Sequence, residues 1–346
     1  MMNVFKIRRT KMLDDAVKDH KPQTSFTVML IFYLVYVIGN FLSKVILIIP
    51  SGIWMISYDG FTGMIARYTA SVISGKGDDT EYNQFMQEMA ANTPSWVLLM
   101  SYVSFIGLII AAVFYCKKFE KRPLCSLGIR KKSLFKEYGI GALIGACMIS
   151  LTVLIALISG SVSLNFNPEG FKPMIILFII GFIIQGLAEG TLFHGYFMMS
   201  IARDNKIAVA IGTSAVLFSL LSGGGEATTL SIINSVLFGI FLGVYVFKRG
   251  DIWGACAIHT LWNFFGGCIY GSVMDGINKL PTLFVMINNE KMHLANGGSV
   301  GIEGGVASTI ILLFAVSLVF LLRTKKGEES LSDATDFEQT IHGSQN

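Results

Sequence analysis

Long apolar runs, separated by short polar segments, dominate this sequence and leave few classes of fold open to it. A helix of about 20 apolar residues crosses a hydrocarbon core about 30 Å thick, so runs of this length indicate membrane spans. Eight runs meet that criterion: 26–49, 95–116, 138–159, 174–199, 206–222, 229–247, 252–271 and 305–322. We therefore expect an all-α membrane protein, a polytopic bundle of about eight transmembrane helices.

The composition agrees with a lipid environment. Hydrophobic residues make up 53% of the chain and charged residues 14%, whereas a soluble domain carries about 25% charged residues. The five cysteines form no C-x-x-C pair, and no phosphate loop, serine triad or nucleic-acid motif is present. We expect the lipid bilayer as a partner, and no nucleic acid.

The basic residues orient the spans. If the chain crosses the membrane eight times, 21 of its 27 Lys and Arg residues fall on one side. They lie in the N-terminal tail, in the loop 117–136 and in small clusters after the fourth, sixth and eighth spans. Because cytoplasmic loops carry an excess of Lys and Arg, we expect a multi-pass protein of the cell membrane with both termini in the cytoplasm.

This topology divides the chain into segments. We expect a cytoplasmic basic tail at 1–24, three N-terminal helices over 25–160 with an outward loop at 51–94, core helices over 173–271, an outward loop at 272–304, a last span at 305–322 and a disordered cytoplasmic tail at 323–346. The last tail is short and polar, as disordered segments commonly are.

Ionisable and polar groups within the spans are costly and therefore indicate function. Glu189 and His194 lie in the fourth span, and His259 and Asn263 lie in the seventh. His259 and Asn263 are four residues apart, which puts them on one helix face. An imidazole, an amide oxygen and a carboxylate in one wet cavity could bind a divalent metal or activate water. The alternative is that these groups form hydrogen bonds between helices and have no chemical role.

Three segments in this region resemble one known family. They are 187–195, 218–222 and 257–263, and they contain Glu189, Phe218 and the His259–Asn263 pair at the expected spacings. Together they resemble the CAAX protease and bacteriocin-processing family (CPBP, or Abi), whose motifs are Glu-Glu-x-x-x-Arg, Phe-x-x-x-His and His-x-x-x-Asn or His-x-x-x-Asp. The resemblance covers about 173–271 and is weaker elsewhere.

The resemblance implies a CPBP-type core and a membrane-embedded, metal-dependent endopeptidase that is reached from the cytoplasmic side and cleaves peptides near their C-termini. It implies zinc or another divalent metal as the cofactor. Glu189 matches the first glutamate, while His259 and Asn263 match the third motif, so the resemblance makes these three the catalytic and metal-binding residues. The substrate would be a peptide, either lipidated or of the bacteriocin type.

Three positions depart from the family motifs. Gly190 replaces the second glutamate, His194 replaces the arginine and Ser222 replaces the histidine of the second motif. Ser222 is a candidate metal ligand only because it occupies the position of the family's histidine. Its chemistry argues against the role, because serine binds zinc less well than imidazole. His194 is a further catalytic candidate, but on a straight α-helix it would point about 140° away from Glu189, so it needs a local bend.

Three functions therefore stay open. The first is the endopeptidase. The second is a pseudoenzyme on the same fold, a membrane scaffold or a bacteriocin-immunity or regulatory protein that binds a peptide or membrane-protein partner. The third is a transporter, because buried Glu and His suit proton-linked transport, although the sequence lacks the two similar halves that many transporters show.

Overall fold

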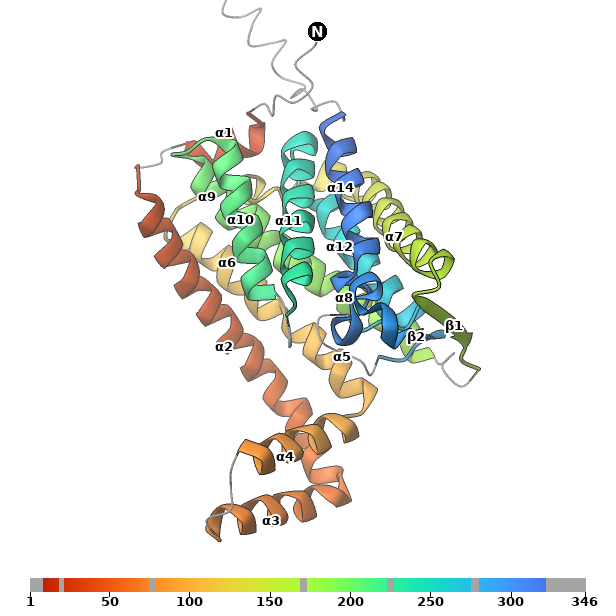
Figure 1. The fold of residues 1–346 in the computed structure, drawn as a ribbon. Coiled ribbons are helices and arrows are strands. Elements are labelled where there is room, and N and C mark those ends of the chain that lie inside the picture. Colours follow the sequence, from red (N-terminus) through yellow and green to blue (C-terminus); the bar gives the residue numbers. More distant parts are fainter. Residues whose placement is uncertain are drawn as a thin grey trace, which may run out of the picture.

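A computed structural model describes residues 9–18, 22–74, 79–168, 173–222, 227–274 and 280–321. The expected disordered tail at 323–346 and residues 1–8 and 19–21 of the basic tail lie outside these residues. The described chain forms a bundle of helices, with the short helix α1 (Lys11–Val17) and the last turn of α14 (Val306–Leu321) at one end (Figure 1). We refer to this end as the α1 end.

All eight expected spans contain helix. Five helical stretches are long and apolar enough to cross a membrane: Ser25–Ser57, Ser95–Lys118, Lys131–Ile158, Pro173–Ala202 and Thr229–Arg249. They correspond to α2 (Ser25–Ser57), α5 and α6 (Ser95–Ser104 and Ile106–Lys118), α7 (Leu134–Ile158), α8 and α9 (Pro173–Glu189 and Met198–Ala202) and α11 (Thr229–Arg249). The other helices of the bundle, α10 (Ile207–Ser222), α12 (Trp253–Phe264) and α14, are shorter. The chain is thus a membrane helical bundle, while the number of eight crossings stays a prediction.

The segment expected as an outward loop at 51–94 is mostly helical. Helix α2 continues through Pro50 to Ser57, and α3 (Asp59–Ile73) and α4 (Asp79–Asn92) form a hairpin that projects from the bundle (Figure 1). The rings of Tyr68 and Phe85 stack with centroids 5.0 Å apart and join the two helices. The amphipathic sequence of this stretch therefore forms its own small contact instead of an irregular loop.

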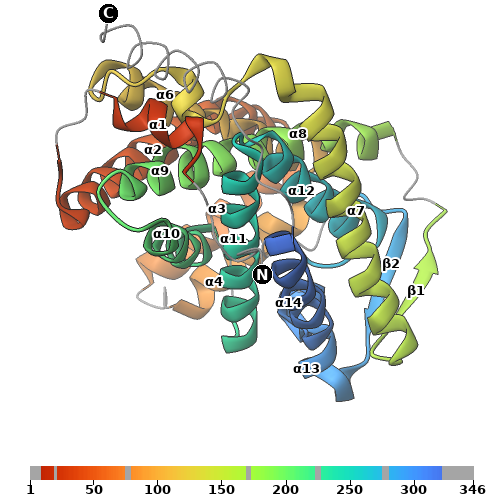
Figure 2. The same ribbon diagram turned by 90° about the horizontal axis from the view of Figure 1, so that it is seen from above.

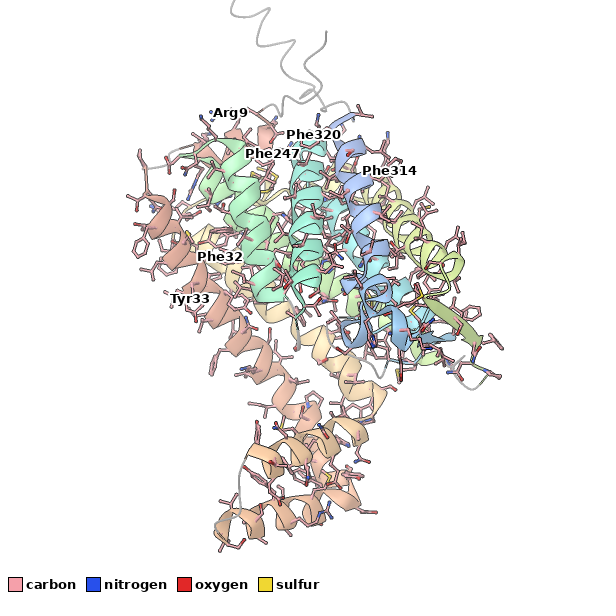
Figure 3. The ribbon with its side chains drawn as sticks, viewed as in Figure 1. Arg9, Phe32, Tyr33, Phe247, Phe314 and Phe320 are labelled. Carbon is pink, nitrogen blue, oxygen red and sulfur yellow. The ribbon has the colours of Figure 1, made fainter. Side chains whose placement is uncertain are left out.

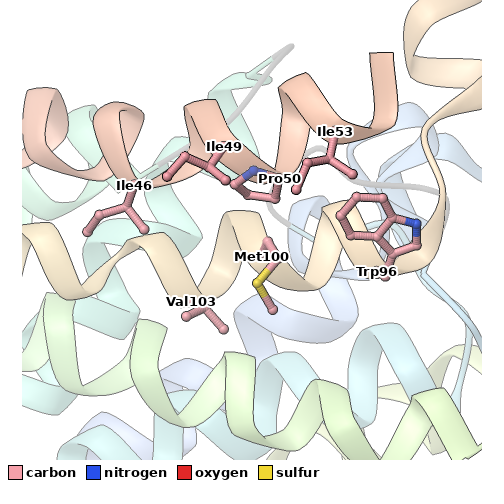
Figure 4. Close-up of a pocket in the computed structure, with 7 residues that line it drawn as sticks. All are labelled: Ile46, Ile49, Pro50, Ile53, Trp96, Met100 and Val103. Atoms are coloured by element: carbon pink, nitrogen blue, oxygen red, sulfur yellow. The ribbon is translucent and has the colours of Figure 1, made fainter. Parts of the chain in front are cut away.

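A pocket of about 380 Å³ lies between the C-terminal half of α2 and helix α5 (Figure 4). It is lined by Ile46, Ile49, Pro50 and Ile53 of α2 and by Trp96, Met100 and Val103 of α5. Every lining side chain is apolar except at the indole nitrogen of Trp96. None of the polar residues of the core helices lines this pocket, so it is not the candidate site.

The described chain is largely helical, as expected of an all-α membrane protein, and it also contains one small sheet. Strand β1 (Val162–Phe166) pairs antiparallel with β2 (Phe284–Asn288), with Val162 opposite Asn288. The second strand, followed by α13 (His293–Asn296), lies within the segment expected as the outward loop 272–304. Pairing satisfies the backbone groups of two segments that leave the bundle in extended conformation.

Glycines of α7 let α12 approach closely. A Cβ added at Gly141 would lie 2.1 Å from the carbonyl oxygen of Gly254, and one at Gly145 would lie 2.3 Å from that of Ile258. Spacing of small residues by four is a common way to bring membrane helices together. The backbone of α7 therefore touches the backbone of α12 directly.

Helix α8 repeats the same arrangement on another side of α12. A Cβ at Gly186 would lie 2.7 Å from the carbonyl oxygen of Cys256, and one at Gly190 would lie 2.3 Å from its Sγ. Figure 2 shows α12 between α7 and α8. Helix α12, which carries His259 and Asn263, is thus fixed from two sides by backbone contacts.

Candidate functional site

The structure brings Glu189 and His259 together in the interior of the bundle. Glu189 is the last residue of α8, His259 lies in the middle of α12, and their side chains face each other with Oε2 of Glu189 3.6 Å from Nδ1 of His259. The two residues are 3% and 5% exposed. A separation of 3.6 Å is an ion-pair distance but is longer than a hydrogen bond. A buried carboxylate and an imidazole are therefore held near each other without a direct hydrogen bond.

Asn263 holds the other nitrogen of the imidazole. Its Nδ2 lies 3.2 Å from Nε2 of His259, one turn earlier on α12, and 3.2 Å from Oε1 of Gln185 on α8. With the amide donating to Nε2, the neutral ring of His259 carries its proton on Nδ1, facing Glu189. The side chains of Gln185, Asn263, His259 and Glu189 thus form a continuous polar row across two helices.

Gln185 is a site residue that the motif comparison misses. It lies four residues before Glu189, on the same face of α8, and is buried. The signal in the sequence was its polar side chain within an otherwise apolar span. Both helices therefore contribute a pair of polar residues spaced by four, and the two pairs meet side to side.

His194 lies near the polar row because the helix changes type after Glu189. Residues Gly190–Phe197 form a π-helical segment, whose turns hold more residues than α-helical turns. This supplies the bend that His194 requires and rotates it toward the face of Glu189. The ring of Phe218 is a common neighbour of both imidazoles, with its centroid 6.2 Å from that of His194 and 5.7 Å from that of His259. His194 is 1% exposed, and neither of its ring nitrogens hydrogen-bonds within the described part of the chain.

Ser222 is placed less favourably. It is the last residue of α10, one helical turn beyond Phe218, so the ring of Phe218 and not the serine lies against the imidazoles. Its buried Oγ has no hydrogen-bond partner among the described residues. The structure therefore gives no contact between Ser222 and the polar row of Glu189, His259 and Asn263.

A buried arginine from the basic loop 117–136 supports the π-helical segment. Arg122 donates to the carbonyl oxygen of Gly195 at 3.5 Å and to Oγ of Ser200 at 2.9 Å. Its charge is balanced by Glu120 at 2.9 Å, which also pairs with Arg203. Charge-assisted hydrogen bonds of this kind are stronger than neutral ones. The loop thus provides a buried anchor for the π-helical segment that contains His194.

The nitrogen and oxygen atoms of Glu189, His259 and Asn263 can be compared with the zinc site that the family resemblance implies. Both nitrogens of His259 face protein groups, and the amide nitrogen of Asn263 is turned toward the imidazole. Across the described ranges, no three His, Cys, Asp or Glu side chains converge in a way that could hold a metal ion. The arrangement of these residues therefore does not fit zinc, whose sites usually take three or four converging protein ligands.

A comparison with protein families identifies the core. Residues 171–265 match the Rce1-like family model, described as type II CAAX prenyl endopeptidase Rce1-like. This segment is Rce1-like. The match contains all three motifs and is consistent with the CPBP family, so the resemblance found in the sequence is confirmed over this part of the chain. Helices α2 to α7 lie outside it. No curated protein and no solved structure matches the chain.

The Rce1-like match and the structure together define the candidate site. The polar row comes from α8 and α12 within the matched segment, and Phe218 of α10 packs against the ring of His259. Helix α2, from outside the match, also contacts this region, because Phe32 packs against Phe193 with ring centroids 5.6 Å apart. The Rce1-like core is therefore completed by the N-terminal part of the chain.

Proposed function

We propose that the Rce1-like core is an intramembrane endopeptidase in which Glu189 and His259 activate a water molecule. The observation that carries this proposal is the 3.6 Å separation of a carboxylate and an imidazole, both buried and fixed on different helices. Polar groups at slightly more than hydrogen-bond distance are commonly bridged by water. A water bound to both groups would be polarised and positioned for attack on a peptide carbonyl.

The reaction can be written through these residues alone. Glu189 removes a proton from the water while the oxygen of the water bonds to the carbonyl carbon of the peptide. The tetrahedral intermediate carries its negative charge on the former carbonyl oxygen, where Nδ1–H of His259 is the nearest donor of the row. The C–N bond then breaks as Glu189 passes the proton to the leaving amine. Asn263 and Gln185 keep the imidazole in the tautomer that this step needs.

We derive no step through a metal, because the described donors do not converge. Zinc, which the family resemblance implies, is a separate prediction that elemental analysis of the purified protein tests, with wild type beside His259→Ala. The substrate class that the family suggests is a peptide with a lipidated C-terminus or of the bacteriocin type.

The test is hydrolysis of a fluorogenic, prenylated peptide by the full chain in lipid vesicles. Removing a general base typically costs about 10²-fold or more in rate, so Glu189→Gln and His259→Ala should each lose activity to at least this extent. The matched controls are Glu88→Gln on α4 and His293→Ala on α13, which make the same changes outside the site. Equal activity of all variants would contradict the proposal.

A non-catalytic scaffold or immunity partner is the second candidate function. Two observations favour it: Gly190 leaves no space for the second glutamate of the family, and Ser222 does not contact the polar row. This candidate predicts that the wild-type protein cleaves no peptide. It also predicts that cells carrying Glu189→Gln or His259→Ala show the wild-type phenotype when the variant is as abundant as the wild-type protein. Loss of the phenotype in either variant would argue against it.

A further inference from the structure

His194 is a buried side chain to which the proposed reaction gives no role. It is 1% exposed, and neither Nδ1 nor Nε2 has a hydrogen-bond partner among the described residues. A buried polar group without a partner costs free energy, because it has given up its bonds to water and gained none in exchange. Such a group in a folded protein needs an explanation, and a catalytic role is one of those that apply.

Hydrogen bonds from other elements hold the backbone on both sides of His194. The carbonyl oxygen of Phe193 accepts from Oγ of Ser214 at 3.0 Å, and that of Gly195 accepts from the guanidinium of Arg122 at 3.5 Å. Both donors are buried, and buried carbonyl groups need such partners. The backbone of the π-helical segment is thus held in place, while the imidazole that it carries is left without a bond.

The change of helix type brings His194 toward Glu189. Backbone hydrogen bonds in a π-turn join residues five apart, and His194 follows Glu189 by five residues, within the segment that begins at Gly190. On a regular α-helix the same separation would turn the two side chains about 140° apart. Single π-turns inside α-helices occur frequently at functional sites. The imidazole is therefore carried to the side of the helix on which the carboxylate lies.

The ring of His194 lies against the face of Phe218. The two ring planes are 30° apart, a stacked arrangement, whereas His259 meets the same phenyl ring at 74°. Stacking uses the face of an imidazole and leaves free the edge that carries its nitrogens. The two imidazoles thus share one aromatic neighbour, and they are close enough to interact electrostatically.

The chemistry of the proposed reaction calls for donors at the oxygen that becomes negative. Nδ1–H of His259 is the donor that the polar row brings to this oxygen, while the amide of Asn263 is engaged on Nε2 of the same ring. Sites that stabilise a tetrahedral intermediate commonly combine several donors at the oxyanion. A neutral imidazole carries one N–H donor, and that of His194 is not engaged within the described part of the chain.

We propose that His194 is a catalytic residue whose N–H donates to the carbonyl oxygen of the scissile peptide and stabilises the negative charge that this oxygen gains. No proton is transferred to or from His194 in this step. The inference rests on the proposed function for the identity of the reaction. It assigns a role to a residue that replaces the arginine of the family motif.

The first test is the hydrolysis of a fluorogenic, prenylated peptide by the full chain in lipid vesicles. His194→Phe keeps a planar ring and removes the donor. Loss of one oxyanion donor lowers kcat by about 10²–10³-fold, so we expect a loss of this size with little change in KM. His194→Gln, whose amide keeps an N–H, should recover part of the loss. A rise in KM at unchanged kcat, or equal losses in the two variants, would overturn the role.

The second test is thermal unfolding of the same variants in detergent, which needs no cleavage. Because an unpartnered buried imidazole costs stability, His194→Phe should not lower the Tm. The matched control is Tyr245→Phe on α11, which removes a buried hydroxyl that also has no partner among the described residues. This control should lower neither the Tm nor kcat. A fall in Tm that parallels the loss of kcat across His194→Phe and His194→Gln would mark a structural residue and overturn the proposal.

Binding of a transition-state analogue separates this inference from the proposed function. A prenylated peptide phosphinate carries a tetrahedral, anionic centre that is not hydrolysed, and its Kd for the full chain in detergent is measured by calorimetry. We expect His194→Phe to weaken binding about 10²-fold, and Tyr245→Phe to leave the Kd unchanged. Such a loss in a protein that cleaves no peptide would support the role of His194 and count against the endopeptidase.

Other outcomes would overturn the role of His194. They are equal Kd values for wild type and His194→Phe, and no binding of the phosphinate by wild type. Cleavage that depends on Glu189 but is unchanged in His194→Phe would also overturn it, while leaving the proposed function intact.

Discussion

Gly190 shows how one residue departs from a family motif for a reason of space. The position carries glutamate in the CPBP pattern, but here α8 approaches α12 so closely that even a methyl group would lie 2.3 Å from Sγ of Cys256. The close approach also places Glu189 opposite His259. The loss of the second carboxylate and the geometry of the first are therefore consequences of the same contact.

Replacing Gly190 by alanine should destabilise the protein. Overpacking of a tight core costs about 1–3 kcal/mol, which thermal unfolding in detergent would detect as a lowered Tm. In Gly190→Ala with Cys256→Ala the Sγ is gone and the nearest remaining side-chain atom is Cβ, at 3.7 Å. The double variant should therefore recover most of the loss relative to Cys256→Ala. Additive losses in the two variants would contradict this account.

At the scale of elements, α12 is positioned by the glycines of two neighbouring helices. Gly141 and Gly145 of α7 face backbone atoms of α12, whereas Gly186 and Gly190 face the backbone of Cys256 and the side chains of Thr260 and Cys256, so an added Cβ would clash at each position. The π-helical segment then turns His194 toward the site, and Arg122 satisfies the carbonyl of Gly195 within it. Each element thus has a contact that explains its position.

Helix α7 offers a matched pair of substitutions. Gly141→Ala would place Cβ 2.1 Å from the carbonyl oxygen of Gly254, whereas a Cβ at Gly139 meets nothing within 4 Å. We expect Gly141→Ala to lower stability by about 1–3 kcal/mol and Gly139→Ala to leave it unchanged or slightly raised, because alanine favours helix. Thermal unfolding of both variants measures the difference. Similar Tm values would show that α7 and α12 are not in backbone contact.

At the scale of the molecule, the pattern of exposed residues is that of a bundle surrounded by lipid. Phe247 is buried inside the bundle, while Phe314 on α14 is exposed, as are many other large apolar side chains of the long helices (Figure 3). The described basic loop 117–136 and the hairpin of α3 and α4 lie at opposite ends of the bundle (Figure 1). This separation is what the positive-inside rule requires of a cytoplasmic and an outward segment.

The orientation itself can be measured in intact cells. A cysteine at Gln84 in α4 should react with a membrane-impermeant maleimide added outside, and one at Lys131 should react only after the cells are permeabilised. Both positions are exposed, so accessibility depends on the side of the membrane alone. The reverse pattern, or labelling of both from outside, would contradict the expected orientation, in which the loop 117–136 faces the cytoplasm.

The sequence by itself determined the class of the molecule, the position of its helices and the identity of Glu189, His259 and Asn263 as a polar set. It could do so because the cost of polar groups in hydrocarbon leaves a strong local signal. It also located the Rce1-like segment by three short motifs. The helical hairpin at α3 and α4 and the pairing of β1 with β2 were not predicted, because contacts between segments decide both.

The tertiary structure alone decided how the polar residues meet. The role of Gln185 depends on two helices being in register, and the position of His194 depends on a π-helical segment that residue counting on an α-helix does not anticipate. A hydrogen bond from the hydroxyl of Tyr36 to the carbonyl oxygen of Leu221 joins residues 185 positions apart in the chain. The sequence shows which polar side chains lie within apolar spans and must therefore be buried away from lipid. The distances between these side chains are set by how closely the helix backbones pack.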